Sequence, residues 1–263
     1  MNDLIISCIQ TELVWEDKPA NLQHIEAWLQ QVPSTAHIVV LPEMFATGFS
    51  MNAAALAESM DGPTIQWMKD MARQYRKIIT GSLIIAEGGR YYNRLIWMLP
   101  NGQYYHYDKR HLFGFAGEDQ HFSAGKEKTI VQVNGWKICL QICYDLRFPV
   151  WARQQAPSAQ GIQYDILLYV ANWPERRIGA WDTLLKARAI ENQCYVVGVN
   201  RVGNDKSGIY HNGSSSIIDP WGEVLWNLQH EEGIHTQQLD YAPLQNAREK
   251  LPFLKDGDRF MIL

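Results

Sequence analysis

The chain has 263 residues, and its 24 Lys and Arg against 28 Asp and Glu give a formal net charge of −4. Proteins that bind nucleic acid or anionic membranes present an excess of positive charge, so neither is an expected partner. With 46% hydrophobic and 20% charged residues, the composition is globular and excludes a disordered chain. No low-complexity linker or internal repeat divides the sequence, so residues 1–263 are expected to form a single domain.

The apolar segments and the cysteines indicate the compartment. No run approaches the roughly 20 apolar residues of a membrane span, and the first residues do not begin a signal peptide. The four cysteines form no C-x-x-C motif and have no zinc-finger spacing with histidines. We therefore expect a cytoplasmic protein with reduced cysteines and without a metal or other cofactor.

Strand and helix patterns alternate at the start of the chain. Alternating apolar residues predict a strand over Leu4–Gln10, and apolar residues at helical spacing predict a helix over Asn21–Val32. The almost wholly apolar run His37–Leu41 is typical of a strand covered on both faces. Pro63 is suited to begin a second helix, and a strand over Ile78–Ala86 follows it.

Tight-turn dipeptides and further apolar runs predict the remaining elements. Turns are expected at Gly88-Gly89, Asn101-Gly102 and Asn134-Gly135, between strands Tyr91–Leu99, Gln103–Tyr107, Thr129–Val133 and Trp136–Ile142. Strands Tyr164–Val170 and Cys194–Asn200 flank a helix over Ile178–Ile190, and a meander of Ser214–Asp219, Val224–Leu228 and Ile234–Leu239 precedes a helix over Leu244–Lys250. This mixture indicates an α/β fold with mixed sheets and helices on the outer faces.

Three reactive side chains each follow a predicted strand: Glu43, Lys109 and Cys143. Ligands of open α/β sheets bind outside the carboxyl ends of strands, so these side chains are candidates for one site. Each has an ordinary alternative: an acid in the first turn of a helix, a solvated lysine, or a small buried thiol. Between Cys139 and Cys143, the second lies at the end of its strand and is the better candidate nucleophile.

The segments around these residues resemble a known family. They are Leu41-Pro42-Glu43, Tyr107-Asp108-Lys109-Arg110-His111-Leu112-Phe113 and Ile142-Cys143-Tyr144-Asp145-Leu146-Arg147-Phe148-Pro149. In order and spacing they resemble the Glu, Lys and Cys motifs of the nitrilase, or carbon–nitrogen hydrolase, superfamily. The sequence is most similar to the omega-amidase branch, whose members hydrolyse the terminal amide of short dicarboxylic monoamides such as 2-oxoglutaramate and 2-oxosuccinamate.

The resemblance implies a fold, a partner and a mechanism. The fold is a four-layer α-β-β-α sandwich that usually packs as a homodimer, and the only other partner expected is a small-molecule amide. Cys143 becomes the nucleophile that forms a thioester, and Glu43 the general base that accepts its proton. The Lys109 ammonium is expected to lower the pKa of the thiol and, with the backbone N–H of Tyr144, to stabilise the oxyanion. Glu118 would orient Lys109 and the substrate; its alternative is an exposed loop carboxylate.

Residues that follow these motifs are candidates for substrate binding. The guanidinium of Arg147 suits a substrate carboxylate, although an ion pair with Asp145 or another acid is an equally good interpretation. Phe115 and Trp173 are candidate walls of a small pocket, with burial in the core as their alternative. Asn172 is a candidate to support a substrate oxygen.

Other functions share parts of this evidence. An N-carbamoyl amino-acid hydrolase, an aliphatic amidase or a nitrilase would use the same Glu-Lys-Cys set. A non-catalytic binding member of the fold would be expected to have lost one of the three residues. A redox pair of Cys139 and Cys143 is excluded, because four residues of strand separate the Cα atoms by about 13 Å.

Overall fold

The computed structural model describes residues 3–155 and 161–262, whose strands form two sheets packed face to face. The six-stranded sheet has the order β13-β1-β2-β3-β4-β5, and the seven-stranded sheet has the order β10-β11-β9-β8-β7-β6 with β12 paired to β11. The strands are β1 (Leu4–Gln10), β2 (Ile38–Val40), β3 (Ile78–Glu87), β4 (Arg90–Met98), β5 (Tyr104–Asp108), β6 (Ile130–Val133), β7 (Trp136–Ile142), β8 (Ile166–Ala171), β9 (Tyr195–Asn200), β10 (Val202–Asn204), β11 (Tyr210–Ile218), β12 (Val224–Gln229) and β13 (Gly233–Leu239).

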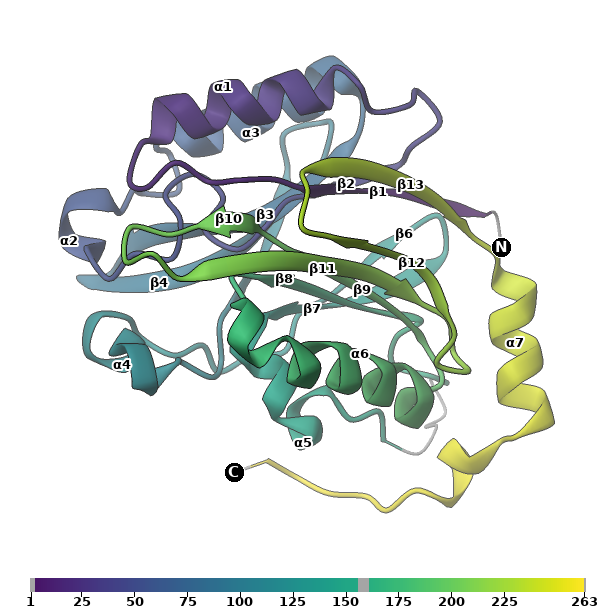
Figure 1. Ribbon diagram of the computed structural model, residues 1–263. Helices are drawn as coiled ribbons and strands as arrows, with labels where there is room; N and C mark the ends of the chain where they lie inside the picture. The colour runs from purple at the N-terminus through teal and green to yellow at the C-terminus, as the bar shows by residue number, and fades with distance from the viewer. Residues whose placement is uncertain (1–2, 156–160, 263) are drawn as a thin grey trace.

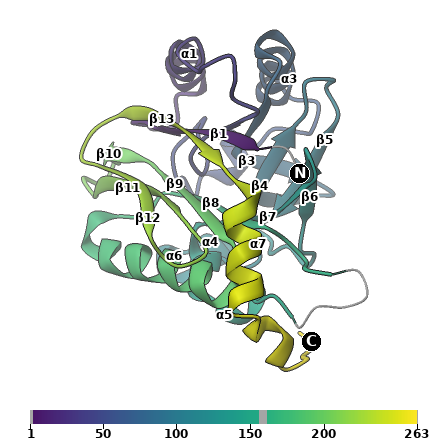
Figure 2. The same ribbon diagram turned by 90° about the vertical axis from the view of Figure 1, so that its right-hand side faces the viewer.

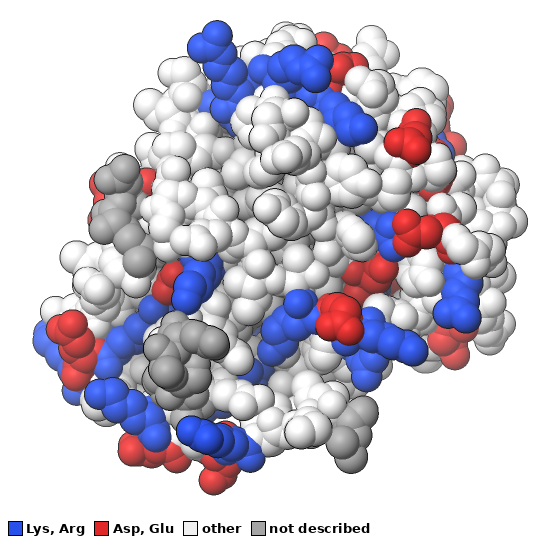
Figure 3. Space-filling view, turned by 180° about the vertical axis from the view of Figure 1, so that it is seen from behind, with Lys and Arg blue, Asp and Glu red and all other residues white. Residues whose placement is uncertain are grey.

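Helices cover the outer face of each sheet. Figure 1 shows α1 (Lys18–Leu29) and α3 (Pro63–Tyr75) over the first sheet, and α6 (Ile178–Asn192) with α5 (Pro149–Ala152) over the second. Helix α7 (Tyr241–Lys250) lies across one end, as Figure 2 shows. The layers form the four-layer α-β-β-α sandwich that the family resemblance implied. No helix within the described ranges has the length and apolar composition needed to cross a bilayer. On the face seen from behind, Lys and Arg side chains lie near Asp and Glu side chains around a central uncharged region (Figure 3).

The central strand β2 shows how the sequence produces these layers. Its three residues are fully buried, because Ile38 and Val40 pack into the core between the sheets and Val39 packs beneath the helices. Strands β1, β2 and β3 run parallel, as do β7, β8 and β9. Parallel strands have all their carboxyl ends at one edge, where the connecting loops begin.

The predicted turns and elements agree well with the structure. Gly88-Gly89 and Asn134-Gly135 connect hairpins, and all four residues have the positive φ that a type I′ turn requires. Pro63 is the first residue of α3. The first helix begins at Lys18 rather than Asn21, because the Asp17 side chain caps it by accepting a hydrogen bond from the Ala20 amide.

The predicted three-stranded meander at the end of the chain is wrong. Strands β11 and β12 form a hairpin, but β13 crosses to the other sheet and pairs antiparallel with β1. Chain order alone does not reveal this exchange, because local patterns carry no information on which edge a strand joins. The sequence analysis also did not predict β10 or the four-residue helices α2 (Ala53–Leu56), α4 (Glu118–His121) and α5.

Candidate active site

The carboxyl ends of β2 and β5 bring Glu43 and Lys109 together. Both side chains are fully buried, and Lys109 Nζ lies 2.9 Å from Glu43 Oε1. The two residues are 66 positions apart in sequence, so their contact is a product of the sheet and not of a local turn. The structure thus supports the inference that these strand-end residues share one site.

Glu118 supplies a second carboxylate to the same ammonium. Its oxygens lie 2.8 and 3.0 Å from Lys109 Nζ, and Oε2 also accepts a hydrogen bond of 2.6 Å from the Phe113 amide. The side chain is fully buried, so the interpretation as an exposed loop carboxylate is wrong. Its position at the first residue of α4 depends on the preceding Gly117, which adopts a positive φ.

Asn93 is a site residue that the sequence analysis missed. From the middle of β4, its Nδ2 donates to Glu43 Oε1 at 2.8 Å and to Glu118 Oε1 at 3.1 Å. Its main-chain oxygen accepts a hydrogen bond of 3.0 Å from the Lys109 amide. The sequence does contain one indication of this role: Asn93 is a polar residue within the predicted strand Tyr91–Leu99, and a buried asparagine needs polar partners.

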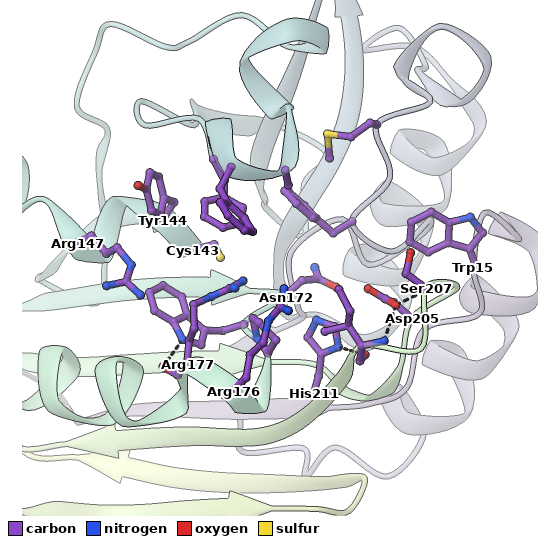
Figure 4. Close-up of a pocket in the computed structure, with 18 residues that line it drawn as sticks. Trp15, Cys143, Tyr144, Arg147, Asn172, Arg176, Arg177, Asp205, Ser207 and His211 are labelled. Carbon is purple, nitrogen blue, oxygen red and sulfur yellow. Dashed lines mark hydrogen bonds between the residues drawn. The ribbon is translucent and has the colours of Figure 1, made fainter.

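Cys143 follows β7 and begins a 3₁₀ helix that ends at Arg147. Its φ of 42° is in the left-handed region, a conformation that costs a non-glycine residue about 1–3 kcal/mol and occurs often at functional sites. The residue is held there by the chain that flanks it. Cys143 lines a cavity (Figure 4), and the charges of Glu43, Lys109 and Glu118 act on its thiol.

Asp145 stabilises this strained turn. Its Oδ2 accepts hydrogen bonds from the Ile142 amide at 3.0 Å and the Tyr107 hydroxyl at 2.8 Å, and its Oδ1 accepts one from the His111 amide at 3.0 Å. The carboxylate thus links the residue before Cys143 to Tyr107 and His111, which lie on either side of Lys109 in the sequence. Arg147 is not among its partners, so the predicted alternative of an Arg147–Asp145 ion pair is wrong.

The electrostatics of the cluster differ from the expectation for the thiol. Burial, and then the negative charge of Glu43, raise the pKa of the Cys143 thiol well above its usual value, and Lys109 only partly opposes them. Lys109 thus lowers the pKa of the thiol as expected, but the net pKa is raised because desolvation of the thiolate outweighs one ammonium. Burial also disfavours the Lys109 ammonium, but Glu118 and Glu43 outweigh it and raise the pKa of Lys109. The cluster consequently holds a charged lysine beside a protonated thiol.

A cavity of about 390 Å³ opens in front of Cys143 (Figure 4). Every predicted substrate-binding residue lines it, namely Phe115, Tyr144, Arg147, Asn172 and Trp173. Phe115 is 81% exposed at the rim, whereas Trp173 is buried in the wall. Residues that the sequence analysis did not single out also line it, among them Trp15, Phe49, Phe113, Arg176, Arg177, Asp205 and His211.

Asn172 lines the cavity and also contacts Glu43. Its amide nitrogen Nδ2 donates to the main-chain oxygen of Glu43 at 2.5 Å, and its main-chain N–H donates to Glu43 Oε2 at 2.8 Å. Both hydrogen bonds hold Glu43 in position, and the contact of Asn172 with a substrate oxygen stays a prediction. Asn172 connects the end of β8 to the base that follows β2.

Comparison with known proteins agrees with this geometry. A family model described as carbon-nitrogen hydrolase matches residues 5–249. The chain is 44% identical to omega-amidase YafV of Yersinia enterocolitica and 42% identical to that of Escherichia coli K12, with 100% of both chains covered in each case. It is 34% identical to the 2-oxoglutaramate amidase of Bacillus subtilis, covering 95% of this chain and 96% of that one.

Solved structures show the same fold. A CN-hydrolase superfamily protein from Xanthomonas campestris, with an arsenic adduct in its active site, superposes with a TM-score of 0.98 at 40% identity, covering 100% of both chains. An amidase from a Nesterenkonia species gives a TM-score of 0.81 at 25% identity, covering 95% of this chain and 98% of that one. That structure is of a Glu-to-Gln mutant of the amidase and shows the result of Michael addition of acrylamide at its active-site cysteine.

Proposed function

Because this chain belongs to the carbon-nitrogen hydrolase family, we propose that it is an omega-amidase that hydrolyses short dicarboxylic monoamides such as 2-oxoglutaramate and 2-oxosuccinamate. The observation that carries the proposal is the position of Cys143 between the buried cluster of Glu43, Lys109 and Glu118, whose charges act on its thiol, and a cavity that Arg147 also lines. The first arrangement suits amide hydrolysis, and the second suits a substrate with an anionic end.

The first chemical step needs a base because the thiol rests protonated. Glu43 accepts the Cys143 proton while the sulfur attacks the amide carbonyl carbon, and the carbonyl π electrons move to oxygen. Lys109 Nζ and the Tyr144 backbone N–H are the donors assigned to this oxyanion. The loss of one such donor typically costs about 2.7–4 kcal/mol of transition-state stabilisation.

The same carboxyl group completes both half-reactions. Protonated Glu43 gives its proton to the departing nitrogen, the C–N bond breaks, and ammonia leaves a thioester on Cys143. Glu43 then removes a proton from a water that attacks the thioester, and the acid is released as the thiol is protonated again. Asn172 and Asn93 hold the two oxygens of Glu43 in position for these transfers.

Glu118 acts on Lys109 in this proposal and not on the substrate directly. Its two oxygens surround Nζ and support the ammonium form in a fully buried site, where an uncompensated charge would be costly. Arg147 is assigned to the substrate carboxylate. Trp173 forms a wall of the cavity and Phe115 lies at its rim.

The test is ammonia release from 2-oxoglutaramate and 2-oxosuccinamate, with neutral short-chain amides as controls. We expect fast release from the keto-acid amides, slow release from the neutral amides, and none from Cys143→Ala. Equal turnover of neutral and acidic amides would contradict the assignment of the anionic end. Activity confined to carbamoyl amino acids or nitriles would move the protein to another branch of the family, and a lack of activity on every amide would indicate a binding protein.

The predicted single domain, homodimer and cytoplasmic location belong to the same proposal. Their support is the continuous run of predicted elements, the family resemblance and the reduced cysteines. Light scattering of the purified protein at micromolar concentration tests the homodimer, and a mass of one chain would contradict it.

A further inference from the structure

Two arginines from different elements meet in the cavity on the side of Cys143. Arg147 ends the 3₁₀ helix that begins at Cys143, and Arg177 ends a 3₁₀ helix, Glu175–Arg177, that follows β8. Both line the cavity, and Figure 4 shows them on the Cys143 side of it, away from Asp205 and Ser207. The sequence analysis considered only the first.

Aromatic rings fix both guanidinium groups. Arg147 lies over the Trp173 ring at 4.8 Å, and Arg177 lies over the Phe113 ring at 5.1 Å. Trp173 also donates from Nε1 to the main-chain oxygen of Arg177 at 2.8 Å, so one tryptophan braces both residues. Stacking occupies the face of a guanidinium and leaves the N–H groups at its edge available to a ligand.

Within the described part of the chain, neither guanidinium has a carboxylate partner. Asp205 is the acid that lines this cavity, and its Oδ1 accepts hydrogen bonds from the Ser207 and Ile209 amides. Burial, followed by the charge of Arg176, lowers the pKa of Arg177, and Arg147 adds to this effect. A concentration of positive charge without a counter-ion favours an anionic ligand.

We infer that Arg147 and Arg177 form one subsite for a 2-oxo carboxylate, and that Arg177 is the residue that distinguishes a 2-oxo acid amide from its saturated analogue. The inference rests on the proposed function and extends it to a residue. A 2-oxo carboxylate presents three acceptor oxygens on adjacent carbons, whereas a simple carboxylate presents two. One guanidinium can take the two carboxylate oxygens, and a second one is matched only when the keto oxygen is present.

The test compares two substrates in two proteins. For the wild type and Arg177→Gln, kcat/KM is measured with 2-oxoglutaramate and with glutaramate, which differs only by lacking the keto oxygen. We expect the variant to lose about 10- to 100-fold on the first substrate, mainly through KM, and less than about threefold on the second. Equal losses on the two substrates would overturn the inference.

Two further variants separate recognition of the keto oxygen from a general effect of positive charge and from an effect on folding. Arg176→Gln removes the same charge from the neighbouring, more exposed residue, and its smaller loss should be the same for both substrates. Arg177→Lys keeps the charge but not the planar fork, so it should still lose more activity on 2-oxoglutaramate than on glutaramate. If Arg177→Lys restores full wild-type preference, charge alone explains the effect and the inference fails.

A binding experiment keeps this inference distinct from the proposed activity. Acrylamide alkylation of Cys143 is followed by mass spectrometry in the presence of 2-oxoglutarate or glutarate, which are the acids that hydrolysis of the two amides releases. We expect 2-oxoglutarate to protect the wild type better than glutarate, and this advantage to disappear in Arg177→Gln. If 2-oxoglutarate protects Cys143 in an Arg177-dependent way but no ammonia is released from the amides, the proposed function is contradicted and the subsite is supported. Equal protection by the two acids in the wild type would overturn the subsite.

Discussion

The two sheets contribute differently to the site, although both present the ends of parallel strands to it. The first sheet supplies Glu43, Asn93 and Lys109, all of them fully buried and hydrogen-bonded to one another or to Glu118. The second sheet supplies Cys143 and, after it, Arg147, which line the cavity. The groups of the proton-transfer cluster are thus shielded from solvent, whereas the group assigned to substrate selection, Arg147, lines the open cavity.

This division has a physical basis. Hydrogen bonds and charges act more strongly where water is excluded, so a buried base and ammonium keep their positions and their mutual influence. Residues that bind substrate must instead be accessible. The comparison predicts that changes to the buried groups of the first sheet mainly lower kcat, whereas changes to the second sheet's cavity residues other than the nucleophile Cys143 mainly raise KM.

Removal of the nucleophile should have the largest effect. Cys143→Ala is expected to lower kcat by about 10⁴-fold or more, because no other group can form the thioester. Cys139→Ala is the matched control, since this thiol lies fully buried on β7, the strand that precedes Cys143, and is not assigned to the site. It should retain nearly all of the activity, measured as ammonia release. A comparable loss in Cys139→Ala would mean that the effect is one of folding.

Glu43→Gln should have opposite effects on two properties of the site: it should slow hydrolysis but make the Cys143 thiolate easier to form. Hydrolysis is expected to fall by about 10²–10⁴-fold, because a Gln cannot accept and return the proton. Glu43 raises the pKa of the Cys143 thiol, so removing its charge should lower that pKa. The rate of acrylamide alkylation should therefore rise at a lower pH in the variant than in the wild type. Alkylation shifted to higher pH in the variant would contradict this sign.

The structure also shows which parts of the site the sequence could reveal. Glu43, Lys109 and Cys143 follow apolar strands and carry family motifs, so their placement was predictable. Asn93 lies within a strand and carries no motif, and its role depends on a contact with Glu118, which is 25 residues away. The net pKa of the thiol depends on burial, which a strand-end position does not specify. Local patterns likewise placed β13 but not its exchange between sheets.

Asn93→Ala tests this missed residue, and we expect about a tenfold loss of kcat. The change removes the amide that donates to both Glu43 and Glu118, and an unsatisfied buried group typically costs about 1–3 kcal/mol. The loss should appear in kcat with little change in KM, because Asn93 does not line the cavity. Asn93→Gln keeps the amide and should recover part of the rate if it folds equally well. A loss confined to KM would contradict the assignment of Asn93 to the proton-transfer cluster.

Phe115→Ala should have the smallest effect, although the sequence marked this residue as a pocket wall. The side chain is 81% exposed, so truncation removes little buried surface, and its ring lies 5.8 Å from that of Phe113. We expect KM to rise by less than about threefold, with kcat unchanged. Phe113→Ala should raise KM more, because Phe113 supports Arg177 and contacts the Tyr144 ring. If Phe115→Ala instead raises KM tenfold, the loop that carries it must close over bound substrate. The cavity would then be closed to solvent, as the cluster of Glu43, Lys109 and Glu118 is. The difference in solvent access between the two sheets' residues would in that case hold only before substrate binds.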